Sequence, residues 1–158
     1  MHKKVLAEQA LYHGDVKMPT DWELNQEKFT RNQFKFSKDH DRLNSYIIEH
    51  MNLKYKIPLC QIGTWGNIYK PKEVTKLMLE ADLMNLNSSP DFVLLYGVKV
   101  KDCVVHINYD NNRKKDNTWS IPLTDNQFIM FPSTNTYHIE NNQNDSLNFI
   151  QVITYTLD

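Results

Sequence analysis

The stretch FVLLYGVKVKDCVVHINYD, residues 92–110, decides the fold class of this chain. Its two runs, Phe92–Lys101 and Cys103–Asp110, are rich in Val, Ile, Leu and Tyr, as is typical of β-strands. Because side chains alternate along a strand, the second run presents two faces. One face carries Cys103, Val105, Ile107 and Tyr109, and the other carries Val104, His106, Asn108 and Asp110.

The same pattern continues on both sides of this stretch. Six more strands are predicted: Leu59–Tyr69, Thr75–Asp82, Thr118–Leu123, Gln127–Pro132, Tyr137–Glu140 and Leu147–Leu157. The gaps between them are rich in Asn, Asp, Ser and Pro, which are turn residues. Short strands without alternating helices indicate an antiparallel sandwich or barrel. We therefore predict a mainly β jelly roll over residues 59–157.

The first third of the chain has a different character. Apolar residues recur at helical spacing over residues 38–53, which predicts one helix. Residues 1–37 are polar with scattered aromatics, and we expect an arm that wraps the core, with an edge strand near Val5–Leu11 and room for a second short helix. The length of 158 residues suits a single domain, residues 1–158, composed of arm, helix and jelly roll.

Composition excludes several classes of protein. Eighteen basic and nineteen acidic residues give a net charge of −1, so no electrostatic attraction to nucleic acid or to an anionic membrane is expected. The N-terminus lacks the apolar segment of a signal peptide, and no apolar run is long enough to span a bilayer. Two cysteines, Cys60 and Cys103, are too few for a disulfide scaffold. We expect a cytoplasmic protein.

The candidates for a catalytic or metal-binding role are the histidines and carboxylates of the β region. The chain has no P-loop, no GxGxxG, no HExxH and no GxSxG motif. In the strand predicted at residues 137–140, Tyr137 and Ile139 share one face, and His138 and Glu140 share the other.

Several segments together resemble a known family. They are Trp65-Gly66-Asn67-Ile68-Tyr69 followed by Pro71-Lys72-Glu73, the strand FVLLYGV at residues 92–98, and Ile129-Met130-Phe131-Pro132 followed by His138 and Leu147-Asn148-Phe149. In this order they look like the Fe(II)/2-oxoglutarate-dependent oxygenases found in marine phages and bacteria. The resemblance covers about residues 59–157 and implies a double-stranded β-helix, the cupin-like jelly roll.

The resemblance also implies positions for the ligands of iron. His138 matches the distal histidine, and the proximal pair falls near Met78 and Glu80. A thioether is a poor partner for Fe(II), which prefers imidazole and carboxylate. The arginine that would grip 2-oxoglutarate is expected near residues 146–148, but no Lys or Arg follows Lys115. The iron and 2-oxoglutarate ligands are therefore predicted not to be retained.

Three functional hypotheses follow. The first is a degenerate oxygenase-like domain that binds a small molecule or a protein, and its pocket candidates are Tyr69, Tyr96, His106 and His138. The second is an active metal-dependent oxygenase that holds its metal with His138 and Glu80, aided by His106 or Asp82. The third is a sugar epimerase or isomerase that uses a His and a Tyr, drawn from His106, His138, Tyr96 and Tyr137.

We favour the first hypothesis, with ligand and substrate open. Fe(II) and 2-oxoglutarate are cofactors only if the family activity persists. The aromatic content of residues 1–37 also makes a homodimer the expected assembly, because jelly rolls of this size often pair through an edge strand or an N-terminal arm.

Overall fold

Over the residues that the structure describes, the architecture is that of a mainly β jelly roll with one helix packed on its outside. The structure, a computed structural model, describes residues 2–6, 9–15, 40–81, 84–85, 88–109 and 117–158. Its elements are β1 (His2–Leu6), β2 (Gln9–Asp15), α1 (His40–Tyr55), β3 (Leu59–Tyr69), β4 (Phe92–Lys99), β5 (Cys103–Tyr109), β6 (Asn117–Leu123), β7 (Gln127–Pro132), β8 (Tyr137–Asn141) and β9 (Asn148–Leu157).

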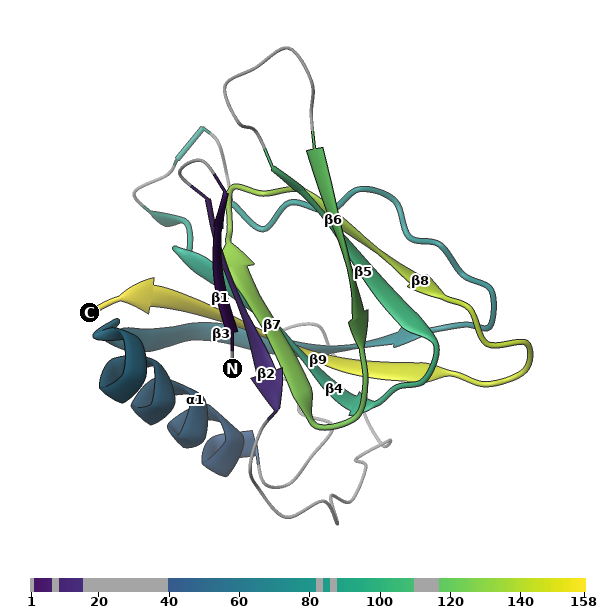
Figure 1. The fold of residues 1–158 in the computed structure, drawn as a ribbon, viewed down its shortest axis with the longest axis horizontal. Helices are drawn as coiled ribbons and strands as arrows, with labels where there is room; N and C mark the ends of the chain where they lie inside the picture. Colours follow the sequence, from purple (N-terminus) through teal and green to yellow (C-terminus); the bar gives the residue numbers. More distant parts are fainter. Residues whose placement is uncertain (1, 7–8, 16–39, 82–83, 86–87, 110–116) are drawn as a thin grey trace.

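The strands form two antiparallel sheets. The larger has the order β1-β2-β7-β4-β9-β3, and the smaller has the order β6-β5-β8. The chain passes repeatedly from one sheet to the other: β3 and β4 lie in the large sheet, β5 and β6 in the small sheet, and β7 again in the large one (Figure 1). This crossing confirms the predicted jelly roll, because the two sheets enclose a common interior.

Two apolar layers hold these elements together. On the outer side of the large sheet, α1 buries Leu43, Ile47 and Met51, which are spaced four residues apart and so share one face of the helix. Figure 1 shows α1 on the side of the large sheet that faces away from β5, β6 and β8. The helix begins two residues later than predicted and ends at Tyr55, before the positive φ of Lys56.

The interior between the sheets forms the second layer. It is filled from both sheets by Tyr69, Val93, Leu95, Val100, Cys103, Val105, Ile107, Leu123, Ile129, Phe131, Tyr137, Ile139, Ile150 and Val152. The alternation predicted for the strand at residues 103–110 is confirmed, since Cys103, Val105 and Ile107 are buried while His106 and Asn108 are half-buried.

Two predictions about the secondary structure were wrong. In place of one edge strand at Val5–Leu11, the chain forms two strands, β1 and β2, which pair with each other and join the large sheet through β7. The rest of the predicted arm, residues 16–37, lies outside the described residues. The predicted strand Thr75–Asp82 is not a regular strand over its described residues, 75–81, and isolated bridges instead join Val74 to Glu140 and Met78 to Tyr137.

The side chain of Thr75 explains why the segment that follows β3 does not pair with β8 as a regular strand. The Ile139 amide donates to Thr75 Oγ1 (2.9 Å) instead of to a main-chain carbonyl, although the Thr75 amide still donates to the Ile139 carbonyl (3.0 Å). A strand ladder needs both bonds from the main chain. Residues 73–80 therefore run beside β8 as an irregular edge, anchored again where Met78 and Tyr137 exchange main-chain bonds of 2.7 and 3.0 Å.

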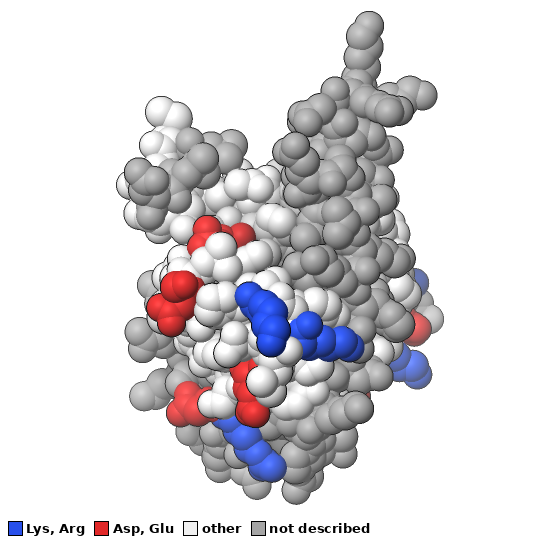
Figure 2. Space-filling view, turned by 60° about the vertical axis from the view of Figure 1, so that its left-hand side comes forward, with Lys and Arg blue, Asp and Glu red and all other residues white. Residues whose placement is uncertain are grey.

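Charges on the described surface are mixed. Figure 2 shows acidic and basic side chains interspersed over the face that it displays, without a continuous patch of either sign among the described residues. Within the part of the chain that the structure covers, no helix is both long and apolar enough to cross a bilayer.

Candidate functional site

A pocket opens at the end of the interior where β3 meets the irregular edge. It has a volume of about 480 Å³ and is lined by Trp65, Asn67, Ile68, Tyr69, Glu73, Met78, Leu79 and Glu80. Strand β3 places Trp65, Asn67 and Tyr69 on one side, because alternate residues share a face. The edge at residues 73–80 supplies the other side, held against β8 by the bonds of Thr75 and Met78.

The polar groups of this pocket form two linked pairs. Tyr137 donates from Oη to Glu80 Oε1 (2.7 Å), and Asn67 donates from Nδ2 to Tyr69 Oη (3.1 Å). Burial raises the pKa of Tyr137 well above its usual range, and the neighbouring Glu80 carboxylate adds to the shift. Burial likewise raises the pKa of Tyr69, partly offset by the bond from Asn67. Both phenols are therefore neutral at physiological pH, and Tyr137 acts as a donor to Glu80.

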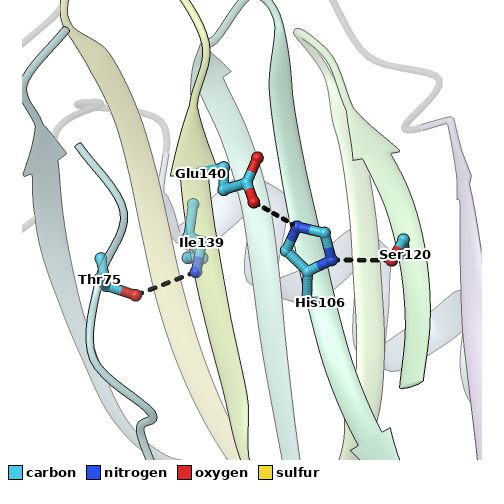
Figure 3. Close-up of polar contacts among 5 residues, drawn as sticks. All are labelled: Thr75, His106, Ser120, Ile139 and Glu140. Atoms are coloured by element: carbon cyan, nitrogen blue, oxygen red, sulfur yellow. Dashed lines mark hydrogen bonds and ion pairs between the residues drawn. The ribbon is translucent and has the colours of Figure 1, made fainter. Parts of the chain in front are cut away.

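A second group of chemically capable side chains lies on the outer face of the small sheet. The ligand atoms of His106, His138 and Glu140 lie within 4.8 Å of one another. His106 and His138 are direct cross-strand partners, and their rings stack with centroids 4.4 Å apart and planes 19° apart. His106 Nδ1 lies 2.7 Å from Ser120 Oγ and its Nε2 lies 3.1 Å from Glu140 Oε1 (Figure 3).

The histidines of this outer cluster are incompletely bonded. The Nδ1 atom of His138 is buried and has no hydrogen-bond partner, and the contact between His106 Nε2 and Glu140 lacks hydrogen-bond geometry. Desolvation and the neighbouring His106 lower the pKa of His138, while Glu140 opposes that shift. The His138 imidazole is thus held in its neutral form, in which a ring nitrogen offers a lone pair.

The structure separates the residues that sequence reasoning grouped. Tyr69, Met78 and Glu80 lie at the pocket, whereas His106 and His138 point away from the interior. Because Glu80 bonds Tyr137 and His138 stands on the opposite face of β8, the described residues do not bring Glu80 and His138 together.

The remaining candidates lie elsewhere or outside the description. Tyr96 is buried beneath α1, where its Oη donates to Asn126 Oδ1, so the structure does not place it at the pocket. Asp82 falls outside the described residues. Tyr96 and Tyr137 are both buried in apolar clusters, away from the stacked histidines His106 and His138. The structure therefore does not form the His–Tyr pair that acid–base catalysis would need.

Sequence reasoning missed three contributors to the pocket and one to the outer cluster. Trp65 was assigned to the core, and Asn67 and Glu73 were used only to carry the resemblance, yet all three line the pocket. The alternation along β3 could have found Asn67, since it shares the face of Trp65 and Tyr69. Glu140 was placed on the face of His138, but its approach to His106 depends on the pairing of β5 with β8.

Comparisons with known proteins agree with this architecture. No protein-family model and no curated protein sequence matches the chain significantly. Among solved structures, a prolyl-4-hydroxylase from Pseudomonas putida is similar with a TM-score of 0.59 at 8% identity, covering 94% of this chain and 92% of that one. A 2OG-Fe(II) oxygenase-family oxidoreductase from Burkholderia pseudomallei gives 0.56 at 10% identity, covering 93% and 66%.

A third similar structure is the non-heme alpha ketoglutarate dependent epimerase SnoN from nogalamycin biosynthesis. Its TM-score is 0.58 at 10% identity, and the match covers 76% of this chain but only 56% of that protein. The likeness is one of fold. The chain therefore has a jelly-roll fold similar to that of these three proteins, and its activity has to be argued from its own residues.

The residues of the pocket do not fit the iron that this fold commonly carries. A facial triad needs two imidazoles and one carboxylate. The pocket lining offers Glu73, Glu80 and the Met78 thioether, and among the residues that the structure describes it contains no histidine and no basic residue. Tyr137 occupies the inward position of β8 next to Glu80, and its phenol donates to the Glu80 carboxylate.

Proposed function

We propose that this chain is an oxygenase-like domain that binds a small organic cation in the pocket between β3 and the edge at residues 73–80, and that it does not use iron or 2-oxoglutarate. The observation that carries the proposal is the pocket lining, which combines two carboxylates with aromatic side chains. The fold supplies a concave interior, as cupin-like proteins do.

The charge of the lining argues against a dicarboxylate ligand. 2-Oxoglutarate is recognised through a basic group that forms paired hydrogen bonds with its distal carboxylate. Glu73 and Glu80 would instead repel it, and the described part of the lining holds no Lys or Arg to offset them. The same carboxylates favour a ligand that carries positive charge.

The aromatic residues add a second reason for a cation. Trp65 and Tyr69 line the pocket beside Glu80. Ammonium groups are attracted to the faces of aromatic rings, most strongly to indole. Glu80 accepts one bond from Tyr137 and retains further lone pairs for a ligand N–H, because a carboxylate can accept about four. An alkylammonium ion of a few carbons matches both features.

Binding can be tested with choline and ethanolamine as probes. We expect both to bind the full chain in calorimetry and to shift the indole resonance of Trp65, and we expect 2-oxoglutarate not to bind. Glu80→Gln and Trp65→Ala should weaken binding, while Glu49→Gln, which removes an exposed carboxylate from α1, should leave it unchanged. Equal affinity in Glu80→Gln and in the unaltered chain would refute the proposed pocket.

The loss of oxygenase chemistry needs its own measurement. The purified chain should take up no stoichiometric iron in the pocket and should form no succinate when supplied with Fe(II), 2-oxoglutarate and dioxygen. Stoichiometric iron together with succinate production that Glu80→Gln abolishes would overturn this part of the proposal.

A further inference from the structure

We propose that His106, His138 and Glu140 form a zinc-binding site on the outer face of the small sheet. This site lies on the opposite side of β8 from the ligand pocket, and it is independent of the function proposed above. Two imidazoles and one carboxylate are ligands typical of Zn²⁺, and three protein ligands leave a fourth position for water.

The site is built on three adjacent strands. Ser120 in β6, His106 in β5 and His138 in β8 are aligned by direct register pairing, and Glu140 follows two residues after His138 on the same face. Side chains held on neighbouring strands need little reorganisation to meet a common ligand. His106 is 17% exposed and Glu140 is 31% exposed, so an ion can reach both from solvent.

The distances suit a tetrahedral ion. With Zn–N and Zn–O bonds of about 2.1 Å, two ligand atoms of one tetrahedral zinc lie ~3.4 Å apart. His106 Nε2 and Glu140 Oε1 are 3.1 Å apart without hydrogen-bond geometry. These two atoms are better placed to bind the same metal ion than to form a hydrogen bond with each other.

His138 supplies the third ligand after a small movement. Its Nδ1 is buried without a partner, and all three ligand atoms lie within 4.8 Å of one another. Because the two rings stack with planes only 19° apart, their in-plane lone pairs do not yet meet. A rotation of the His138 ring that shifts its nitrogen by at most about 1.4 Å brings it to the tetrahedral separation.

Ser120 serves as a positioning residue. Its Oγ lies 2.7 Å from His106 Nδ1, so it can accept a hydrogen bond from Nδ1–H and leave the Nε2 lone pair free toward Glu140. Zinc-bound histidines commonly hold their second nitrogen in this way. This contact explains how an imidazole on an open sheet face keeps the tautomer that a metal requires.

The test uses the full chain without an affinity tag and measures Zn²⁺ by calorimetry. We expect one equivalent to bind the unaltered protein, His138→Gln and Glu140→Gln to abolish that binding, and Ser120→Ala to weaken it about tenfold to a hundredfold. Co²⁺ should give the visible absorption bands of tetrahedral coordination in the unaltered protein and not in His138→Gln or Glu140→Gln. Glu140→Gln provides the safer variant for folding, because Glu140 is partly exposed.

Two control variants remove histidines elsewhere. His50→Gln changes a histidine of α1, and His13→Gln changes one of two histidines that the pairing of β1 with β2 places opposite each other. Both controls should bind Zn²⁺ like the unaltered protein. The proposal fails if the unaltered chain binds no zinc, if His138→Gln or Glu140→Gln retains full affinity while folded by circular dichroism, or if His13→Gln removes the binding.

Discussion

Replacing Gly97 with alanine should destabilise the corner at which the chain leaves the large sheet. Gly97 lies at the register shift between β4 and β9, three residues before the chain turns toward β5. A Cβ atom at this position would lie 2.2 Å from the Thr124 carbonyl oxygen and 2.7 Å from Val100 Cγ2. Carbon and oxygen that are not bonded normally stay more than 3 Å apart, so the carbonyl would have to move by about 1 Å.

The turn that holds this carbonyl cannot move without breaking other bonds. The Asn126 amide donates to the Gly97 carbonyl (2.8 Å), and the Gln127 amide donates to the Thr124 carbonyl (3.3 Å). Each bond is worth about 0.5–1.5 kcal/mol, and overpacking itself costs about 1–3 kcal/mol. We therefore expect Gly97→Ala to lower the free energy of unfolding by ~3 kcal/mol, which corresponds to a fall in Tm of about 6–12 °C.

Gly63 provides the matched control. It lies in β3, also beside a register shift against β9, but a Cβ there would meet only Thr154 Oγ1 at 3.4 Å, an ordinary contact. Alanine in a strand also avoids the entropic cost of glycine, about 0.5–1 kcal/mol. Gly63→Ala should thus be neutral or slightly stabilising. In urea titrations followed by tryptophan fluorescence, a Gly97→Ala variant within 0.5 kcal/mol of the unaltered chain, or less destabilised than Gly63→Ala, would refute the reasoning.

Two further predictions concern thiol reactivity and a buried amide. Burial raises the pKa of Cys103 from 9.0 to about 12, so its thiolate is about a thousandfold scarcer at pH 8 than that of an ordinary thiol. When the folded chain reacts with a chromogenic disulfide, exposed Cys60 should release one equivalent of the coloured thiol rapidly. The second equivalent, from Cys103, should appear only on denaturation. Two rapid equivalents would contradict this assignment. The Asn141 side chain donates to the carbonyls of Tyr69 and Lys70 and accepts from the Gln143 amide. Asn141→Ala should cost about 2–4 kcal/mol in the free energy of unfolding, and a loss below 1 kcal/mol would show that water replaces these bonds.

The fold was largely predictable because its strands carry strong local signals. The predicted bounds of β3 and β7 match the structure, and those of the other interior strands differ by no more than two residues. The signal failed at residues 75–82, where apolar residues suggested a strand. There the hydroxyl of Thr75 takes the bond of the Ile139 amide, and a competition between side chain and backbone cannot be seen in an apolar pattern.

The candidate sites were less predictable, because each depends on pairing between distant segments. Tyr69 and Glu80 were proposed separately, but their common pocket exists only because residues 73–80 run beside β8. The contact between Tyr137 and Glu80 joins residues 57 positions apart. The approach of Glu140 to His106 likewise requires that β8 pair with β5 and not with another strand. No local periodicity contains that information.

The disagreement over His138 shows which of two sequence arguments deserves more weight. The resemblance implied an inward iron ligand at this position, whereas strand alternation placed it opposite Tyr137 and Ile139. The structure follows the alternation: Tyr137 and Ile139 are buried in the interior, and His138 stacks on His106 outside it. A slip of one residue turns every side chain of a strand to the other face, so an alignment that is correct for the fold can still be wrong for the site. In this chain the inward position next to Glu80 carries the phenol of Tyr137, and two histidines and a carboxylate lie together on the outer face of the small sheet, where we propose a metal site separate from the pocket.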